Sequence, residues 1–184
     1  MGSAAGAAPA AEQRARGLDE SLLVLARTRL HTPFLERAVA RFSRLGEHAG
    51  IWLAIGAVGY VRAAEPRRPA WRRAGAVVVV SYLLNTAVKL LVRRRRPELG
   101  GLPALARTPT RLSFPSAHAT TSFAGALAYS RACAPASALY ALAGGLSLSR
   151  LYLGVHYPSD VLAGALLGSA LAAALTPPGA ERAP

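Results

Sequence analysis

The chain has 184 residues, a length that suits one domain better than two. Hydrophobic residues make up 52% of it and charged residues 17%, and 22 Lys and Arg against 9 Asp and Glu give a net charge of +13. So much apolar sequence excludes a disordered basic tail. The single cysteine, Cys133, excludes a disulfide framework and a cysteine-built metal site. An integral membrane protein whose small residues let helices pack closely fits this composition best.

The first part of the chain is predicted to lie outside the membrane core. Residues 1–17 are rich in alanine and are expected to form a disordered tail. In residues 18–47 apolar side chains recur with helical spacing in two stretches, and Thr32-Pro33 is a start signal for the second. We expect two amphipathic helices in the headgroup region, with packed helices of a soluble cap as the alternative. His31 is expected to be solvated.

Five apolar stretches near the length that a bilayer requires come next. They lie at about 49–64, 74–92, 117–133, 134–153 and 159–176. No β pattern is present, so the expected fold class is all-α: a polytopic membrane helical bundle of about five transmembrane helices, with N-terminal interfacial helices. Residues 18–176 are expected to form one domain, with the bundle at 48–176 and a loose tail at 177–184. Gly164 and Gly168 have the spacing of a close helix contact.

The distribution of arginine predicts an orientation. Arginines are more numerous in the loops on the N-terminal side, 1–48 and 93–116, than in loop 65–73 on the opposite side. Cytoplasmic loops carry the excess of positive charge, so we expect a multi-pass protein of the cell membrane with its N-terminal side in the cytoplasm. Arg93, Arg94 and Arg95 are interpreted as topology charges and lipid-headgroup contacts.

Two other features concern the surface of the membrane. Residues 93–96 are four consecutive arginines, and such runs also occur in nucleic-acid-binding proteins. Here the run adjoins an apolar helix and has no interleaved aromatic residues, so nucleic acid is not an expected partner. Trp52, Trp71 and Tyr157 are expected to be aromatic anchors at the interface.

Three polar clusters interrupt the apolar sequence, all at the N-terminal-side ends of the expected helices. Ionisable groups at such positions are functional candidates. The clusters are Lys89 with Arg96-Pro97, then Pro115-Ser116-Ala117-His118, then Ser149-Arg150 with His156 and Asp160. The three cations Lys89, Arg96 and Arg150 suit a dianionic phosphate, because arginine offers planar paired donors and lysine a point charge. Glu47 and His48, at the start of the first apolar helix, are candidate substrate contacts.

The remaining polar residues add reactive groups. Ser116 and the amide of Ala117 stand at a helix start, where free N–H groups bind phosphate. His118 is beside them and can donate a proton to a leaving oxygen. His156 and Asp160 are four residues apart and hence on one helical face. Asp160 can therefore accept a hydrogen bond from one imidazole nitrogen and leave the other as a nucleophile.

The ordered blocks K-x6-R-P, P-S-x-H and S-R-x5-H-x3-D, which span residues 89–160, resemble the type 2 phosphatidic acid phosphatase superfamily. That superfamily includes bacterial lipid phosphatases and the vanadium haloperoxidases. The resemblance implies a phosphatase that uses no metal and no other cofactor. It also implies that Lys89, Arg96 and Arg150 hold the phosphoryl oxygens.

The same resemblance assigns roles to the other residues. It implies that Ser116 and the Ala117 amide stabilise the transition state and that His118 is the general acid. His156 would attack phosphorus to form a phosphohistidine, oriented by Asp160. Ala117 stands where the family commonly has glycine, and its methyl group would narrow the space beside the phosphate.

A narrower resemblance concerns the substrate. The segments FSRLGEHAGIW, LSFPSAHATT and SRLYLGVHYPSDV resemble short actinobacterial enzymes assigned as decaprenylphosphoryl-5-phosphoribose phosphatases. This implies a lipid-linked phosphate as substrate and membrane lipids as partners, in the synthesis of cell-wall arabinan precursors. Phosphatidic acid, phosphatidylglycerol phosphate and isoprenyl pyrophosphate are the alternative substrates. A vanadate-dependent haloperoxidase is the alternative from a different class, and the oligomeric state stays open.

Overall fold

The computed structural model describes residues 10–29, 31–132 and 134–177, and their regular elements are helical. In chain order these elements are α1 (Ala10–Thr28), α2 (Pro33–Arg44), η1 (Glu47–Ala49), α3 (Gly50–Arg62), η2 (Glu65–Arg67), α4 (Arg68–Val92), α5 (Ala117–Arg131), α6 (Ala136–Tyr152) and α7 (Pro158–Leu175). Within the described ranges, β pairing is limited to two isolated bridges between α4 and α5. The expected all-α class is therefore confirmed.

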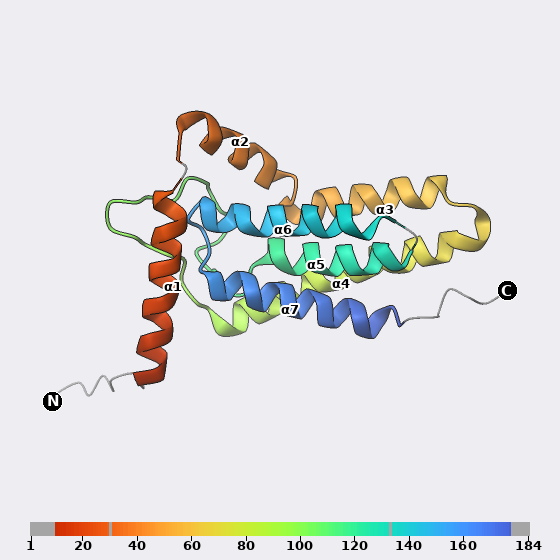
Figure 1. Cartoon of the computed structure of the whole chain (residues 1–184). Helices are drawn as coiled ribbons and strands as arrows, with labels where there is room; N and C mark the ends of the chain where they lie inside the picture. The colour runs from red at the N-terminus through yellow and green to blue at the C-terminus, as the bar shows by residue number, and fades with distance from the viewer. Residues whose placement is uncertain (1–9, 30, 133, 178–184) are drawn as a thin grey trace.

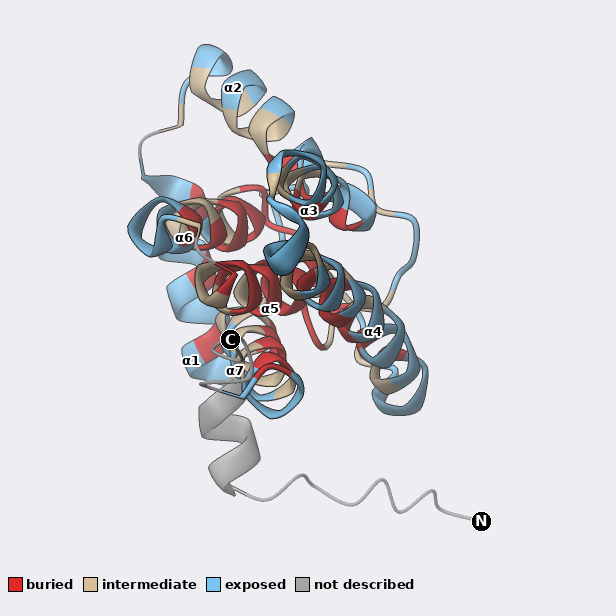
Figure 2. Cartoon of the chain, turned by 90° about the vertical axis from the view of Figure 1, so that its right-hand side faces the viewer, coloured by how far each residue is buried: buried red, intermediate tan, exposed pale blue. Residues whose placement is uncertain are grey.

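Helices α3 to α7 run side by side, with α5 at the centre of the bundle (Figures 1 and 2). Helix α5 packs against α3, α4, α6 and α7. Its sequence is mostly Ala, Ser, Thr and Gly, and small side chains let the neighbouring helices approach closely. Helices α4 and α6 end, and α5 and α7 begin, at the same end of the bundle (Figure 1). The connections 93–116 and 153–157 therefore meet there.

The contact between α5 and α7 depends on two glycines. A Cβ atom at Gly168 would lie 2.0 Å from the carbonyl oxygen of Thr120, and one at Gly164 would lie 2.6 Å from that of Ser116. Both distances are far below van der Waals contact, so only glycine fits. The prediction of a close helix contact at this pair is confirmed.

Trp52 of α3 lies in the core of the bundle and is fully buried. Its ring packs on Gly125 of α5, where a Cβ would come within 2.5 Å of it, and its Nε1 donates to Ser122 Oγ at 2.9 Å. The expectation of an interface anchor at Trp52 is therefore wrong. Trp71 of α4 packs inward too, with its ring centroid 5.6 Å from that of Tyr129.

Large apolar side chains stay exposed on the outer faces of α3, α4 and α7 (Figure 2). They include Leu53, Val58, Val61, Val79, Val80, Leu83, Leu84, Leu90, Leu91, Leu162 and Leu166. Contiguous apolar surface of this kind is rare on soluble monomers. Two described segments, Glu65–Val92 and Pro158–Leu175, are long and apolar enough to cross a membrane by length and composition. The helices α3, α5 and α6 are shorter, with 13, 15 and 17 residues.

Helix α1 lies across the end of the bundle where the two connections meet (Figure 1). It begins at Ala10, inside the segment 1–17 for which a tail was expected. Residues 10–16 are Ala, Glu, Gln and Arg, all strong helix formers, which accounts for the earlier start. Residues 1–9 and 178–184 lie outside the described residues. Toward the bundle α1 buries Asp19, Leu23 and Arg27, and it packs on the ends of α6 and α7.

Helix α2 begins as its sequence predicts. Thr32 is the N-cap and accepts a hydrogen bond from the Leu35 amide at 3.2 Å, and Pro33 is the first helical residue. His31, before the cap, was expected in solvent, but its ring stacks on Tyr152 of α6 with 4.0 Å between centroids. Stacking on a helix end keeps that ring largely buried.

Candidate active site

A cavity of about 550 Å³ opens where the 93–116 connection, the start of α5 and the α6–α7 connection meet. Both predicted histidines, all three predicted cations and both candidate substrate contacts line it. These lining residues are Lys89, Arg96, Arg150, His118, His156, Glu47 and His48, together with Ala117. Ser116 and Asp160 lie behind this lining, and the amide of Ser116 donates to the carbonyl of Asp160 at 3.0 Å. The fold thus brings three separate sequence clusters to one place.

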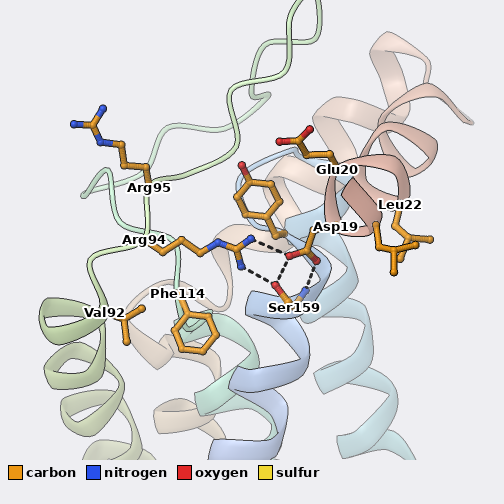
Figure 3. A pocket seen from close by; sticks show the side chains of 10 residues that line it. Asp19, Glu20, Leu22, Val92, Arg94, Arg95, Phe114 and Ser159 are labelled. Atoms are coloured by element: carbon orange, nitrogen blue, oxygen red, sulfur yellow. Dashed lines mark hydrogen bonds and ion pairs between the residues drawn. The ribbon is translucent and has the colours of Figure 1, made fainter. Parts of the chain in front are cut away.

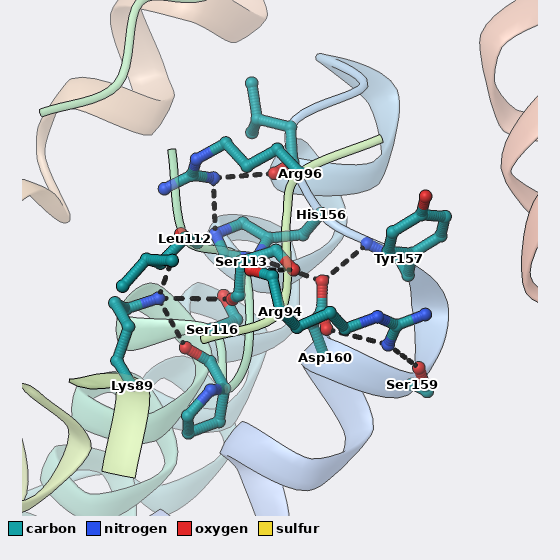
Figure 4. A network of polar contacts seen from close by, with 12 residues as sticks. Lys89, Arg94, Arg96, Leu112, Ser113, Ser116, His156, Tyr157, Ser159 and Asp160 are labelled. Carbon is teal, nitrogen blue, oxygen red and sulfur yellow. Dashed lines mark hydrogen bonds and ion pairs between the residues drawn. The ribbon is translucent and has the colours of Figure 1, made fainter. Parts of the chain in front are cut away.

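His156 has a hydrogen-bond partner on Nε2 and faces a carboxylate with Nδ1 (Figure 4). Arg96 Nη1 lies 3.1 Å from its Nε2, and Asp160 Oδ2 lies 3.5 Å from its Nδ1. A guanidinium can only donate, so Nε2 must be the accepting nitrogen and Nδ1 must carry the hydrogen. This tautomer places a lone pair on Nε2, beside a cation and at the cavity.

The surroundings keep this imidazole neutral. Burial lowers the pKa of His156 to about 3, with the charge of Arg96 acting in the same direction and Asp160 opposing it. At neutral pH the ring therefore keeps its lone pair, as a nucleophile requires. Burial also lowers the pKa of Arg96, to about 10, which still leaves the guanidinium charged at pH 7.

Lys89, near the end of α4, holds the segment that leads into α5. Its Nζ donates to the carbonyls of Leu112, Ser113 and Pro115 at 3.3, 3.2 and 2.9 Å (Figure 4). The ammonium therefore sits at the start of α5, next to the free amides of that helix. A positive charge and a helix N-terminus at one point favour an anion.

Ser43, at the end of α2, connects two of the predicted residues. Its carbonyl accepts a hydrogen bond from His118 Nε2 at 3.0 Å, and its Oγ accepts one from Arg150 Nη1 at 2.6 Å. A carbonyl can only accept, so Nε2 of His118 carries hydrogen and Nδ1 is its remaining nitrogen. The motifs do not contain Ser43. The signal that could have found it is the segment FSRLGEHAGIW, which includes this residue.

The start of α5 is an uncapped helix N-terminus. Ser116 is the N-cap residue, but no side chain caps the helix, and the buried Ser116 Oγ has no hydrogen-bond partner among the described residues. Ala117 is the first helical residue, and its backbone is not left-handed, unlike that of His48, Ala49 and Arg93. A methyl group is therefore compatible with the backbone at the position where the family commonly has glycine.

Arg94 does not have the surface role that the sequence suggested. Its Nη1 donates to Asp160 Oδ1 at 3.0 Å, and its guanidinium lies 4.1 Å from the ring centroid of Tyr157. Tyr157 likewise differs from the expected interface anchor, because it stacks on Arg94 and gives its amide N–H to Asp160 Oδ2 at 2.9 Å. Arg93 and Arg95 are exposed, as expected of topology charges.

A cavity in a helical bundle where three cations surround two histidines suits a bound phosphoryl group. The model of the PAP2 superfamily matches residues 70–179, more than half of the chain, and this protein belongs to that superfamily. Curated relatives extend the match along the chain. It is 36% identical over 172 residues to decaprenylphosphoryl-5-phosphoribose phosphatase of Mycobacterium tuberculosis, covering 94% of this chain and 96% of that protein.

A further relative agrees with this membership, and two crystal structures share the fold. The protein of the same name from Mycolicibacterium smegmatis is 38% identical over 151 residues, covering 81% of this chain and 82% of that protein. The crystal structure of Aquifex aeolicus LpxE superposes with a TM-score of 0.74 at 23% identity, over 86% of this chain and 94% of that one. A transmembrane PAP2 type phosphatidylglycerolphosphate phosphatase from Bacillus subtilis gives 0.68 at 23% identity, over 88% and 84%. These two structures establish the fold.

Proposed function

We propose that this protein is a membrane phosphatase that removes the terminal phosphate of a lipid-linked substrate through a phosphohistidine on His156. The observation that carries the proposal is the lone pair of His156 Nε2 at a cavity that Lys89, Arg96 and Arg150 line, with Asp160 behind the ring. Glu47 is the one carboxylate among the described lining residues, so the cavity favours an anion with more than one charge.

The three cations and the α5 N-terminus bind the phosphoryl group. Arg96 and Arg150 donate to its oxygens, Lys89 adds a point charge, and the amide of Ala117 donates from the helix start. Donors that are fixed before the reaction stabilise the charge that spreads over these oxygens in the transition state. Ser116 Oγ, buried and unpartnered among the described residues, is a further donor toward the same group.

The reaction has two steps. When Arg96 donates to a phosphoryl oxygen instead of to His156 Nε2, the lone pair of Nε2 becomes free. Nε2 then attacks phosphorus, the bond from phosphorus to the alcohol oxygen breaks, and His118 gives a proton to that oxygen. Because His118 Nε2–H is bonded to Ser43, the proton comes from Nδ1 of the imidazolium. Water then attacks the phosphohistidine, His118 accepts a proton from it, and inorganic phosphate leaves with His156 restored. Asp160 stabilises the Nδ1–H of His156 throughout.

The protein crosses the membrane five times, through α3 to α7, and the cavity lies on the cytoplasmic side. The exposed apolar faces of the bundle support this placement, as does the excess of arginine at the end with the cavity. Residues 18–176 form one domain, in which α1 and α2 lie at the interface. The helices α3, α5 and α6 are short for a bilayer. They can span it if the bilayer thins locally or if flanking polar side chains extend to its surface.

The substrate that we propose is decaprenylphosphoryl-5-phosphoribose, with decaprenylphosphoryl ribose as product. The names of the curated relatives support it. Glu47 and His48 line the cavity beside the cations, and a carboxylate there accepts hydrogen bonds from ribose hydroxyls. Tyr82 and Thr86 of α4 line the same cavity, next to the exposed Leu83. The polyprenyl chain leaves the cavity along this face of α4 toward lipid.

Phosphate release by the purified protein tests the proposal. Wild type and His156→Asn are compared on decaprenylphosphoryl-5-phosphoribose, phosphatidic acid, phosphatidylglycerol phosphate and an isoprenyl pyrophosphate. We expect the pentose substrate to give the highest kcat/KM and His156→Asn to lose activity by about 10³-fold or more. An acid-labile phosphoenzyme should form in wild type and not in the variant. Because protein cations carry the phosphate charge, EDTA should leave the rate unchanged.

Two further arms separate the mechanism from the substrate. Near-wild-type turnover by His156→Asn would overturn the mechanism, whichever lipid is preferred. Glu47→Gln should lower kcat/KM for the pentose substrate by about tenfold and leave phosphatidic acid hydrolysis unchanged, because one hydrogen bond to a hydroxyl is lost. An equal loss on both lipids would contradict the ribose contact.

A further inference from the structure

Arg94 lies behind the nucleophile rather than at the cavity. The carboxylate of Asp160 is fully buried, and its two oxygens have different partners. Oδ2 accepts from the Tyr157 amide and faces His156 Nδ1, whereas Oδ1 accepts from Arg94 Nη1 at 3.0 Å (Figure 4). Arg94 therefore fixes the oxygen of Asp160 that does not face the imidazole, and with it the rotation of the carboxylate.

Arg94 is in turn held by helix α1. Its Nη2 donates to Asp19 Oδ2 at 2.8 Å, and its Nη1 donates to Ser159 Oγ at 2.6 Å (Figure 3). Asp19 also accepts from the Ser159 amide at 2.9 Å, at the start of α7. Asp19 is buried although it is charged, which is rare unless the charge is paired. The interfacial helix therefore contributes an ion pair directly to the polar network of the site.

Electrostatics supports a pair in which both groups are ionised. Burial by itself would raise the pKa of Asp19, but the hydrogen bonds from Arg94 and Ser159 outweigh it and lower the pKa. Burial by itself would lower the pKa of Arg94, and the hydrogen bond with Asp19 and the charge of Asp160 reverse the direction. One guanidinium therefore pairs with carboxylates from two distant segments.

We propose that Arg94 is a positioning residue for His156, and that Asp19 makes helix α1 part of the active site through it. The inference rests on the proposed role of His156 as nucleophile. The path runs from Asp19 to Arg94, then to Asp160, then to His156. Arg94 is absent from the lining of the 550 Å³ cavity, so it acts on phosphoryl transfer and not on substrate binding.

The test compares Arg94→Gln with Arg95→Gln. Both variants remove one charge from the same arginine run, but Arg95 is exposed and its side chain points away from Asp19 and Ser159 (Figure 3). We expect Arg94→Gln to lower kcat about 10- to 100-fold with KM within about twofold of wild type, by analogy with the effect of removing groups that orient metal-binding histidines. Arg95→Gln should keep wild-type kcat. Phosphoenzyme formation should slow in parallel with kcat.

The contribution of α1 is tested by Asp19→Asn alone and combined with Arg94→Gln. Asp19→Asn should lower kcat by a smaller factor than Arg94→Gln. If Asp19 acts only through Arg94, the double variant should be no slower than Arg94→Gln. Multiplied losses would show that Asp19 acts separately and would overturn that part of the inference.

Chemical rescue distinguishes positioning from loss of folding. A cavity of about 840 Å³ opens beside Arg94, lined by Asp19, Tyr157 and Ser159. Guanidinium chloride at millimolar concentration should therefore restore part of the kcat of Arg94→Ala, whereas equal sodium chloride should not. Arg94→Lys keeps the charge but cannot bridge both carboxylates, so it should retain intermediate activity. This variant provides the test if Arg94→Gln and Arg94→Ala do not fold.

Two outcomes overturn the inference and leave the proposed function standing. One is wild-type kcat in Arg94→Gln while His156→Asn is inactive. The other is a loss in Arg94→Gln that lies entirely in KM and resists guanidinium. Activity in His156→Asn would instead remove the proposed function itself, so the two failures are separate.

Discussion

The imidazole of His156 has a lower pKa in the folded protein than in the unfolded chain, and this difference couples stability to pH. Burial lowers its pKa to about 3, against an ordinary value of 6.5. Between these values the unfolded chain binds a proton that the folded protein does not. Stability therefore falls as pH drops from 6.5 toward 3, with a slope that approaches about 1.4 kcal/mol per pH unit.

His156→Asn isolates this effect because asparagine does not titrate. We expect the melting temperature in detergent to fall more in wild type than in His156→Asn when pH is lowered from 7 to 5. The pKa of Asp19 lies below 3.8, so the stability that this carboxylate contributes is lost only at lower pH and does not enter the comparison. Equal falls in the two proteins would mean that His156 has the same pKa in the folded and unfolded states, so that burial does not lower it.

The residues of the site differ in how far a sequence reveals them. Lys89, His118 and Asp160 are found by spacing, because each stands in an ordered motif. Arg94 is one of four consecutive arginines, and its partners Asp19 and Asp160 are 75 and 66 residues away. Long-range pairs of this kind leave no local pattern.

A physical signal for Arg94 does exist in the local geometry. The segment after α4 is extended, and Arg95 forms an isolated bridge with Leu112. Alternate residues of an extended chain point to opposite sides, so Arg94 and Arg96 face the protein while Arg95 between them is exposed. If the run had been predicted as extended, both Arg94 and Arg96 would have been expected to face the protein, whereas the motif indicates Arg96 alone.

At the scale of elements, the contact between α5 and α7 fixes the distance between the start of α5, where we propose that phosphate binds, and the helix that carries Asp160. Gly168→Ala would place a methyl carbon 2.0 Å from the Thr120 carbonyl oxygen, and backbone cannot move aside cheaply. We expect a loss of about 1–3 kcal/mol in unfolding free energy, the usual cost of overpacking, measured as a lower melting temperature in detergent.

Gly144→Ala is the matched control for that substitution. Gly144 lies in α6, and a Cβ there meets nothing within 4 Å. The variant should be neutral or more stable by up to about 1 kcal/mol, because alanine is the better helix former. Similar destabilisation by both changes would mean that glycine flexibility, and not the α5–α7 contact, is what matters.

The helices were easier to predict than their packing. All five bundle helices fall within the apolar stretches or begin a few residues before them, since a hydrocarbon environment demands long apolar runs with satisfied backbone. The start of α1 at Ala10 and the inward packing of Trp52 were missed. The start of α1 depends on helix propensity, which an analysis of hydropathy does not detect. The packing of Trp52 depends on Gly125, which lies 73 residues away in the sequence.

For the whole molecule, the proposed orientation places successive connections between helices on opposite sides of the bilayer. Ala64 lies in the α3–α4 connection, Gly100 in the α4–α5 connection and Ser137 at the start of α6, and all three are exposed. In a background in which Cys133 is replaced by serine, cysteine at each site reports the side of the membrane. A Cβ at Gly100 meets nothing within 4 Å, and alanine and serine are close to cysteine in size, so folding should be preserved.

An impermeant maleimide applied to intact cells should label Ala64→Cys and Ser137→Cys, and should reach Gly100→Cys only after lysis. The arginine-rich N-terminal side lies in the cytoplasm, so the connections after the first and third crossings lie outside and the connection after the second lies inside. Labelling of Gly100→Cys alone in intact cells would place the cavity on the outer face, and the phosphate would then have to be delivered from that side. Protection of Ser137→Cys alongside Gly100→Cys would mean that α5, with only 15 residues, enters the bilayer without crossing it.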